Sequence, residues 1–293
     1  MPVPVLNIAQ MREWERATWA TGQTEAEVIR RVGRKIAERA LQLTHPGNAI
    51  LILAGKGHNG DDARAAREHL IDRHVNILDV TEPESALVEF QSSAGVSPAR
   101  TSRDGRATLI IDGLFGIGLD RPLDDGWKKF LAAVNKSKIP ILAVDVPSGL
   151  NADTGLPQGA AIEAAITLTI GAPKIGLLQQ AAWPFVGRLE VVNDVGLSPC
   201  LQKDDLIWTQ PDDFADFPPP RAVSGHKGSF GHLAIVAGSL GYHGAAVLVA
   251  RAAQRAQPGL ITLFTQEITY RPVAEQLQAV MVRSEERRVG KEC

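Results

Sequence analysis

The sequence predicts an α/β protein with a doubly wound sheet, followed by an incomplete second α/β fragment. Short apolar runs recur from residue 49 onward, and several are separated by stretches long enough for a helix. The runs are apolar throughout, as expected for parallel strands covered on both faces. A polar, proline-rich stretch then precedes further runs of the same kind. Ligands bind such sheets outside the carboxyl ends of the strands, so the segments after the strands are the candidates for function.

Two helices are predicted before the first strand. Apolar residues at helical spacing predict an amphipathic helix over residues 24–43, which begins with a capping box formed by Thr24 and Glu27. An earlier helix is predicted over residues 7–20, with Met11 and Trp14 on its inner face.

The apolar runs predict the strands of the first domain and divide the chain. The predicted strands are Ala49–Ala54, Val75–Val80, Thr108–Ile111, Ile139–Val144, Ala165–Ile170 and Leu189–Val192. We place this domain at residues 1–200 and a linker at 201–223, followed by a second unit at 224–283 with strands in GHLAIVAGS and GLITLFT. That unit is shorter than the ~100–150 residues of typical domains. The charged residues 284–293 break the pattern and are interpreted as an appended or chimeric tail.

Composition excludes several classes of function. The 293 residues include 31 basic and 33 acidic side chains, so there is no electrostatic reason to expect a nucleic acid or an anionic membrane as partner. Two cysteines, Cys200 and Cys293, cannot build a disulfide framework. No secretion signal is recognisable, and no apolar run approaches the ~20 residues of a membrane span. We expect a soluble, cytoplasmic protein.

Two glycine-rich segments follow predicted strands. AGKGHNGDDA (residues 54–63) has the strand, turn and helix order that offers backbone N–H groups to phosphate, although it is neither G-x-G-x-x-G nor a Walker A loop. The alternative is a tight turn with Asp61 or Asp62 as a helix cap. IIDGLFGIGLDRPL (residues 110–123) places Asp112 at a strand end before glycines that allow close approach of a ligand. The alternative there is a flexible loop with a capping aspartate.

The third segment, VDVPSGLNADTG (residues 144–155), ends a strand in oxygen-bearing side chains. Asp145 precedes a proline that stops the strand, and a lone aspartate in such a place is commonly a turn-former. With three such strand ends in one sheet, however, Asn59, Asp112 and Ser148 could converge as oxygen ligands of a hard cation. The small number of carboxylates favours a monovalent ion.

Together these segments resemble the NAD(P)H-hydrate epimerase family, over about residues 5–198. Its members carry Gly-x-Gly-Asn-Asn-Gly-Gly-Asp where this chain has GKGHNGDD, Asp-x-x-Phe-Gly-x-Gly where it has DGLFGIG, and Asp-x-Pro-Ser-Gly-x-x-x-Asp-x-Gly from residue 145 to 155. The stretches QMREWERATWATG and GAPKIGL are also similar to the family. The resemblance implies a Rossmann-like fold.

The resemblance also implies roles by position. The residues implied to line the dinucleotide are His58, Asn59, Gly60, Asp61, Asp62, Gly116, Ile117, Gly118, Leu119, Asp120, Arg121 and Pro122. The implied ion is potassium, held by Asn59, Asp112 and Ser148. Asp145 is the implied acid–base residue beside the nicotinamide, and Lys174 is a second candidate for that catalytic site. A homodimer would suit the family.

Two positions depart from the family pattern. His58 stands where the first asparagine is usual, and Asp61 stands where the second glycine is usual. A carboxylate about 4 Å from a pyrophosphate charge would be repelled by about 4 kcal/mol at an effective dielectric constant near 20. We therefore expect Asp61 to face away from the ligand.

Residues 224–254 resemble the start of the ADP/ATP-dependent NAD(P)H-hydrate dehydratase domain, which is ribokinase-like. Gly238, Gly244 and Ala245 would mark part of its substrate wall. The family's Gly-x-Gly-Asp segment lies further along, so we expect no dehydratase activity in this chain and a need for ADP or ATP with Mg²⁺ only in a complete domain.

The resulting hypothesis is an isomerase that interconverts the R and S forms of hydrated NADH and NADPH (NAD(P)HX). Two alternatives remain open at this point. One is a non-catalytic nucleotide-binding or scaffold protein with the same fold, which the departures at His58 and Asp61 favour. The other is a nicotinamide-dependent oxidoreductase, against which the missing G-x-G-x-x-G counts.

Overall fold

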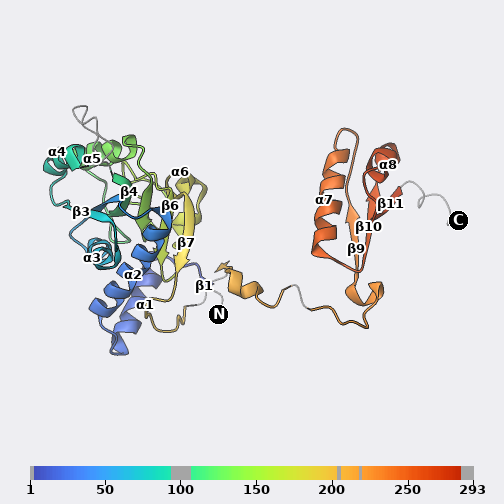
Figure 1. The fold of residues 1–293 in the computed structure, drawn as a ribbon, viewed down its shortest axis with the longest axis horizontal. Helices are drawn as coiled ribbons and strands as arrows, with labels where there is room; N and C mark the ends of the chain where they lie inside the picture. Colours follow the sequence, from blue (N-terminus) through green and yellow to red (C-terminus); the bar gives the residue numbers. More distant parts are fainter. Residues whose placement is uncertain (1–2, 94–106, 203–205, 218–219, 285–293) are drawn as a thin grey trace. The chain divides into compact units, whose positions relative to one another are not determined.

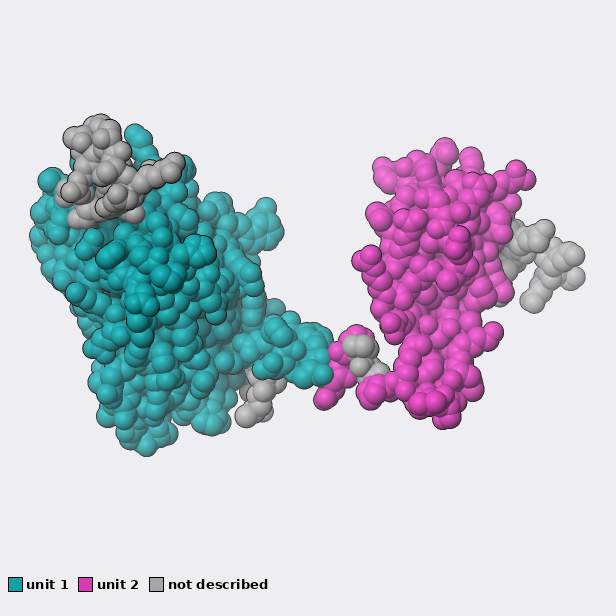
Figure 2. Space-filling model, in the orientation of Figure 1, with its two compact units in different colours: residues 1–215 teal, residues 216–293 magenta. Residues whose placement is uncertain are grey.

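The computed structural model describes residues 3–93, 107–202, 206–217 and 220–284. It divides the chain into two compact units, residues 1–215 and 216–293 (Figure 2). Among the described residues, no helix is long and apolar enough to cross a membrane. Each unit contains its own parallel sheet.

The first unit is built on a six-stranded parallel sheet with the strand order β3-β2-β4-β5-β6-β7. The strands are β2 (Ala49–Ala54), β3 (His74–Asp79), β4 (Ala107–Gly113), β5 (Ile141–Val144), β6 (Ile166–Ile170) and β7 (Arg188–Val192). The predicted strands and the doubly wound α/β class are confirmed, with ends that differ by at most two residues.

Strand β2 lies inside the sheet, and helices cover both of its faces. This explains why its sequence is apolar throughout. Ile50 and Ile52 belong to one core with helices α2 (Glu25–Leu43) and α3 (His58–Ala65). Leu51 and Leu53 point the other way, into a core with helices α4 (Pro83–Ser93) and α5 (Asp125–Lys136). Figure 1 shows these two helix layers on the two faces of the sheet. Alternate residues of one strand face opposite sides, so a strand covered on both faces must be apolar throughout.

The two predicted N-terminal helices are present, and the capping box predicted for the second is confirmed. Helix α2 follows Thr24, whose hydroxyl and Glu27 form the predicted capping box. Helix α1 (Ile8–Ala20) follows Asn7, which forms a second capping box with Gln10. Trp14 is buried, and its indole N–H donates a hydrogen bond to the Ser198 carbonyl at 2.8 Å.

The strand order places a topological switch point between β2 and β4. The chain leaves β2 toward β3 on one side, and β4 then returns to the other side of β2 before β5, β6 and β7 follow outward. A crevice at the carboxyl ends of β2 and β4 is the expected ligand site of such a sheet. The segments after β2, β4 and β5 are the three that the sequence marks as candidates.

The second unit contains a three-stranded parallel sheet with the order β11-β10-β9. Its elements are β9 (His232–Val236), α7 (His243–Ala256), β10 (Leu260–Thr265), α8 (Glu267–Ala274) and β11 (Met281–Ser284). The two predicted strands and the helix between them are present, whereas α8 and β11 are additional. Residues of α7, β10 and the segment after α8 form a small core of their own.

The segment predicted as a linker begins inside the first unit. Strand β8 (Ile207–Trp208) pairs antiparallel with β1 (Val3–Pro4), and the first unit extends to Ala215. Short 3₁₀ turns and the one-turn helix α6 (Trp183–Val186) complete the chain. Of the predicted tail at 284–293, residues 285–293 lie outside the described residues, and Ser284 ends β11.

Candidate active site

A cavity of about 990 Å³ opens at the carboxyl edge of the first sheet. Small-molecule sites are commonly clefts of roughly 300–1,000 Å³, so the cavity could hold a large ligand such as a dinucleotide. Its wall comes from α1, α2, the start of α3, the loop between β4 and α5, and two residues after β5 and β6. The lining residues used in the argument below are Arg12, Glu15, Glu25, Lys56, His58, Asn59, Asp62, Gly116, Ile117, Gly118, Leu119, Asp120, Arg121, Pro122, Asp145 and Lys174.

The glycines after β2 let two strand-end loops approach each other. A Cβ atom added to Gly55 would lie 2.0 Å from the Leu114 carbonyl oxygen, and one on Gly60 would lie 2.1 Å from the Gly55 carbonyl oxygen. Only residues without a side chain fit such contacts. Helix α3 starts directly afterward, with Gly57 as its N-cap and no side-chain cap. Its first turn therefore presents backbone donors at the cavity, as the phosphate-binding interpretation predicts.

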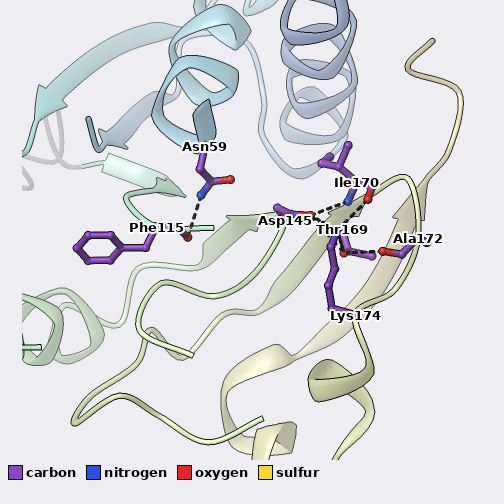
Figure 3. Close-up of polar contacts among 7 residues, drawn as sticks. All are labelled: Asn59, Phe115, Asp145, Thr169, Ile170, Ala172 and Lys174. Carbon is purple, nitrogen blue, oxygen red and sulfur yellow. Dashed lines mark hydrogen bonds and ion pairs between the residues drawn. The ribbon is translucent and has the colours of Figure 1, made fainter. Parts of the chain in front are cut away.

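The three oxygen-bearing residues predicted to converge do meet, around the backbone of Phe115. Asn59 donates its side-chain N–H to the Phe115 carbonyl oxygen at 3.0 Å (Figure 3). The Ser148 hydroxyl accepts the Phe115 N–H at 2.9 Å and donates to Asp112 Oδ1 at 2.6 Å. Asp112 Oδ2 accepts the Ser148 backbone N–H at 2.9 Å. Asn59, Asp112 and Ser148 are all buried and join the ends of α3, β4 and β5 in one hub.

The hub has the chemistry of a cation site. Complete burial raises the pKa of Asp112 to about 6, and its hydrogen bonds from Ser148 and Leu114 only partly oppose that effect. A cation beside the hub would stabilise the carboxylate that burial disfavours. The side chains offer one carboxylate, one amide oxygen and one hydroxyl, beside the Phe115 carbonyl. This donor set suits a weakly held hard cation. Within the described ranges, no three or more histidine, cysteine, aspartate or glutamate side chains cluster in a way that could hold a metal ion.

Asp145 and Lys174 form the second polar centre. The Lys174 side chain is fully buried and forms an ion pair with Asp145 Oδ1. Its ammonium group also donates to the Ile170 carbonyl oxygen at 2.8 Å and to the Thr169 hydroxyl at 3.1 Å. Both residues line the cavity, and Figure 3 shows the Asp145 carboxylate directed at this group.

The backbone holds Asp145 in an unusual conformation with φ of 65°. This left-handed region is uncommon for residues other than glycine, although aspartate tolerates it better than most. The carboxylate itself is fixed by its Oδ1 atom, which also accepts the Ile170 N–H at 3.1 Å. No donor among the described residues bonds to Oδ2. One oxygen of Asp145 is therefore anchored, and the other is available to a ligand.

The structure separates the predicted cavity residues into two groups. His58, Asn59, Asp62, residues 116–122, Asp145 and Lys174 line the cavity. Gly60 and Asp61 do not, and Asp112 and Ser148 lie buried below the surface of the loop.

The two exceptions in α3 each have a physical reason. Gly60 packs against Gly55. Asp61 accepts a hydrogen bond from Arg64 at 2.9 Å, and this partner holds it on the outer side of α3. The expected orientation of Asp61 away from the ligand agrees with this geometry, and the added carboxylate is paired there.

Other oxygen-bearing side chains of the third segment are structural. Asn151 Oδ1 accepts the backbone N–H groups of Asp153 and Thr154 at 3.0 and 2.8 Å. Asp153 accepts the Ile8 N–H at 2.7 Å and so helps to cap α1. The crowding of oxygens after β5 thus serves a turn and a helix end as well as the cavity.

The cavity also contains residues that the sequence reasoning missed. Arg12 and Glu15 from α1 and Lys56 from the glycine loop belong to its wall. Met11, Glu15 and Trp19 recur every four residues and all line the cavity. A charged residue on the inner stripe of an amphipathic helix was the signal that could have identified Glu15.

The chain matches known proteins over this same region. Residues 25–176 match the family model of the YjeF-related protein N-terminus. A protein from Limosilactobacillus fermentum named NAD(P)H-hydrate epimerase is 37% identical over 174 residues, which are 55% of this chain and 83% of that protein. A second, from Limosilactobacillus reuteri and with the same name, is 35% identical over 156 residues, which are 50% of this chain and 74% of the relative.

A longer relative matches across both units. The bifunctional NAD(P)H-hydrate repair enzyme Nnr of Hyperthermus butylicus is 36% identical over 262 residues, which are 84% of this chain and 48% of that protein. The chain thus spans about half the length of the bifunctional relatives that it matches. The family model matches within the first unit, which contains the cavity and both polar centres. This chain therefore belongs to the YjeF-related N-terminal domain family, to which the NAD(P)H-hydrate epimerases also belong.

Proposed function

We propose that this protein is an NAD(P)H-hydrate epimerase, which interconverts the R and S forms of hydrated NADH and NADPH. The observation that carries the proposal is the Asp145 carboxylate, anchored at Oδ1 and open at Oδ2, in a large cavity at the switch point of the sheet. Two relatives that match about half of this chain are named NAD(P)H-hydrate epimerases, which supports the same reaction class.

The reaction requires inversion at C6 of the nicotinamide ring. The hydrate is a carbinolamine, because its hydroxyl-bearing carbon is bonded to N1. Loss of hydroxide gives a planar iminium, and return of water to the other face gives the second epimer. A carboxyl group beside C6 can protonate the departing oxygen or accept a proton from the entering water, which typically contributes about 10²–10⁴-fold to the rate.

The residues around Asp145 suit this work. Lys174 is fully buried and pairs with Oδ1, so it orients the carboxylate from behind. The side chain of Asp145 is only 13% exposed, which limits solvent around the reacting carbon. An anionic carboxylate there also stabilises the positive charge that develops on the ring in the iminium.

The nucleotide part of the substrate would extend along the glycine loop and the loop at residues 116–122. The uncapped first turn of α3 offers backbone N–H groups and the positive end of a helix dipole to phosphate. Gly57 and Gly118 face open space, with no atom within 4 Å of an added Cβ. A phosphate could therefore reach the backbone of both loops.

The hub of Asn59, Asp112 and Ser148 would hold potassium in this proposal. A bound potassium ion would supply positive charge next to the phosphate site and neutralise the buried Asp112. The hub residues themselves fix the loop after β4 through Phe115, because Asn59 and Ser148 both hold its backbone. We assign the hub a binding and positioning role and place the chemistry at Asp145.

The test is an epimerisation assay with the purified 293-residue chain. Separated R and S forms of NADHX are incubated with the protein, and their interconversion is followed by chromatography against the spontaneous rate. Acceleration in the wild-type protein, largely lost in Asp145→Asn, is the expected result. Binding of NADHX without acceleration would show that the chain is a binding protein instead. The same assay with added ADP or ATP and Mg²⁺ tests the expectation that this chain has no dehydratase activity.

A further inference from the structure

Glu15 is a carboxyl group in the cavity that the proposed mechanism does not yet use. It lies on the face of α1 that turns toward the cavity, one turn after Met11 and one turn before Trp19, which also line it. Its side chain is half-buried, and no described residue forms a hydrogen bond or ion pair with it. An unpaired, half-buried carboxyl group is costly unless it serves a ligand or a reaction.

Charged groups from several elements surround Glu15. Asp145 after β5 and Lys174 after β6 are close enough to influence its titration, as are His58 of α3 and Arg12 of α1. Asp62 of α3 and Glu25 of α2 line the same cavity, and Asp62 responds to the charges of both Asp145 and Glu15. Glu15 of α1 and Asp145 after β5 are therefore two of the carboxyl groups that line this one cavity, and they come from separate elements.

The environments of these two carboxyl groups differ. Burial raises the pKa of Glu15 above its usual value, and the charge of Asp145 raises it further. Lys174 forms an ion pair with Asp145 but only partly offsets the effect of burial at Glu15. Two carboxyl groups with different environments in one site are a common basis for dividing acid and base roles.

Inversion at C6 creates a need for two groups. Hydroxide leaves from one face of the ring, and water must enter at the opposite face. Asp145 is anchored through Oδ1 to Lys174 and the Ile170 N–H, and its backbone is held at φ 65°. A carboxylate fixed in this way serves one face of a bound ring, and the opposite face needs a group from another element.

We propose that Glu15 is the second catalytic acid–base group of the epimerase, acting on the face of the nicotinamide ring opposite to Asp145. This inference rests on the proposed function and assigns the two proton transfers to two residues.

The proton balance follows directly. In one direction, the Glu15 carboxylic acid gives its proton to the C6 hydroxyl as the C–O bond breaks, which leaves water, a Glu15 carboxylate and the iminium. Water then adds to C6 from the other face and gives a proton to the Asp145 carboxylate. The reverse direction exchanges the two roles. Proton exchange with solvent then returns Glu15 to the acid and Asp145 to the carboxylate before the next turnover in the same direction, and no oxidant or reductant is needed.

The experiment compares Glu15→Gln with Glu13→Gln. Glu13 lies on the same helix, is exposed and does not line the cavity, so its variant is the matched control. Epimerisation rates are measured from pH 5 to 9, and NADHX binding is measured by the shift in melting temperature that the equilibrated R/S mixture causes. We expect Glu15→Gln to lower kcat by about 10²-fold or more, with an unchanged binding shift. The pH profile of its residual rate should lack the decrease at alkaline pH that deprotonation of Glu15 causes in the wild type.

Three results would overturn the inference while leaving the proposed function intact. One is a Glu15→Gln variant with wild-type rate and pH profile, because Asp145 would then serve both faces. Another is loss of the binding shift together with activity, which would make Glu15 a binding residue. The third is equal loss of rate in Glu15→Gln and Glu15→Asp with no change in the pH profile. An inactive wild-type chain would instead refute the proposed function itself.

Discussion

Asp112 lies near the end of β4 and Asp145 directly follows the neighbouring parallel strand β5, yet the two carboxyl groups have opposite environments. Asp112 is completely buried, and its two oxygens accept hydrogen bonds from the Ser148 hydroxyl and from the backbone N–H groups of Ser148 and Leu114. Asp145 lines the cavity and uses only Oδ1 for its bonds to Lys174, Thr169 and Ile170.

The comparison shows that donors and exposure, and not residue type, decide the role of a carboxyl group at a strand end. A buried carboxyl group whose two oxygens both accept hydrogen bonds can hold loops together or lie beside a bound cation, but it is not free to exchange protons with a substrate. A carboxyl group with a free oxygen facing a cavity can exchange protons with a substrate. The two aspartates thus divide the site into a structural hub and a reactive centre.

The largest expected effect is on the rate, at the reactive centre. Asp145→Asn should reduce epimerisation by about 10²–10⁴-fold, because the amide can replace the hydrogen bonds but not the acid–base function. NADHX interconversion measures the rate, and urea unfolding of the same samples checks that the variant is folded. If Asp112→Asn lowered kcat by the same factor with its binding of NADHX intact, the division of roles would be wrong.

The next effect is the pH dependence of stability, at the hub. The folded-state pKa of Asp112 is raised from 3.8 to about 6, so the folded state binds more protons between these values. Its contribution to stability is therefore present below about pH 4 and is lost as the pH rises through 6, by about 3 kcal/mol.

Unfolding free energies at pH 4 and pH 7.5 measure this loss. In a buffer whose only cation is tetramethylammonium, we expect the full decrease in the wild type and a smaller one in Asp112→Asn. Potassium chloride should reduce the decrease in the wild type alone, because a bound cation stabilises the carboxylate. The same decrease in both proteins and both salts would remove Asp112 as its source.

A smaller effect is expected at the serine of the hub. Ser148→Ala removes the donor 2.6 Å from Asp112 Oδ1 and the acceptor of the Phe115 N–H. Leaving such buried groups unpaired costs about 1–3 kcal/mol of unfolding free energy. Chemical denaturation measures the change, and Ser85→Ala, at an exposed hydroxyl, is the control. A cost no larger than that of the control would contradict the structural role of the hub.

The smallest effect is expected at the rim of the cavity. His58 Nε2 lies 2.9 Å from Glu25 Oε1, with 75% and 47% of their side chains exposed, and the contact is an ion pair only when the imidazole is protonated. Exposed pairs typically contribute about 0–1 kcal/mol, so His58→Asn should change the unfolding free energy by less than about 1 kcal/mol. A decrease of 2 kcal/mol or more in the unfolding free energy would show that this rim contact contributes as much to stability as the buried hub does.

Local signals in the sequence were sufficient for most of the secondary structure and for the position of the site. The capping box at Thr24 and the apolar run Ala49–Ala54 depend on neighbours a few residues apart, and both are as predicted. The three motifs follow strands of one parallel sheet, so their meeting at one edge followed from the fold class. Strand β8 and its pairing with β1 were not predicted, because a two-residue strand has no periodicity to detect.

Tertiary structure alone decided which carboxyl groups keep a free oxygen. Asp61 and Asp62 are adjacent in sequence, but Arg64 holds Asp61 on the outer side of α3 while Asp62 lines the cavity. Glu15 is more than a hundred residues from Asp145, and only the packing of α1 brings it to the same cavity. Helix and strand periodicity determine which face a residue occupies. The packing of those faces determines which distant hydrogen-bond donors reach the residue. These donors decide whether both oxygens of a carboxyl group are occupied or one remains available to react.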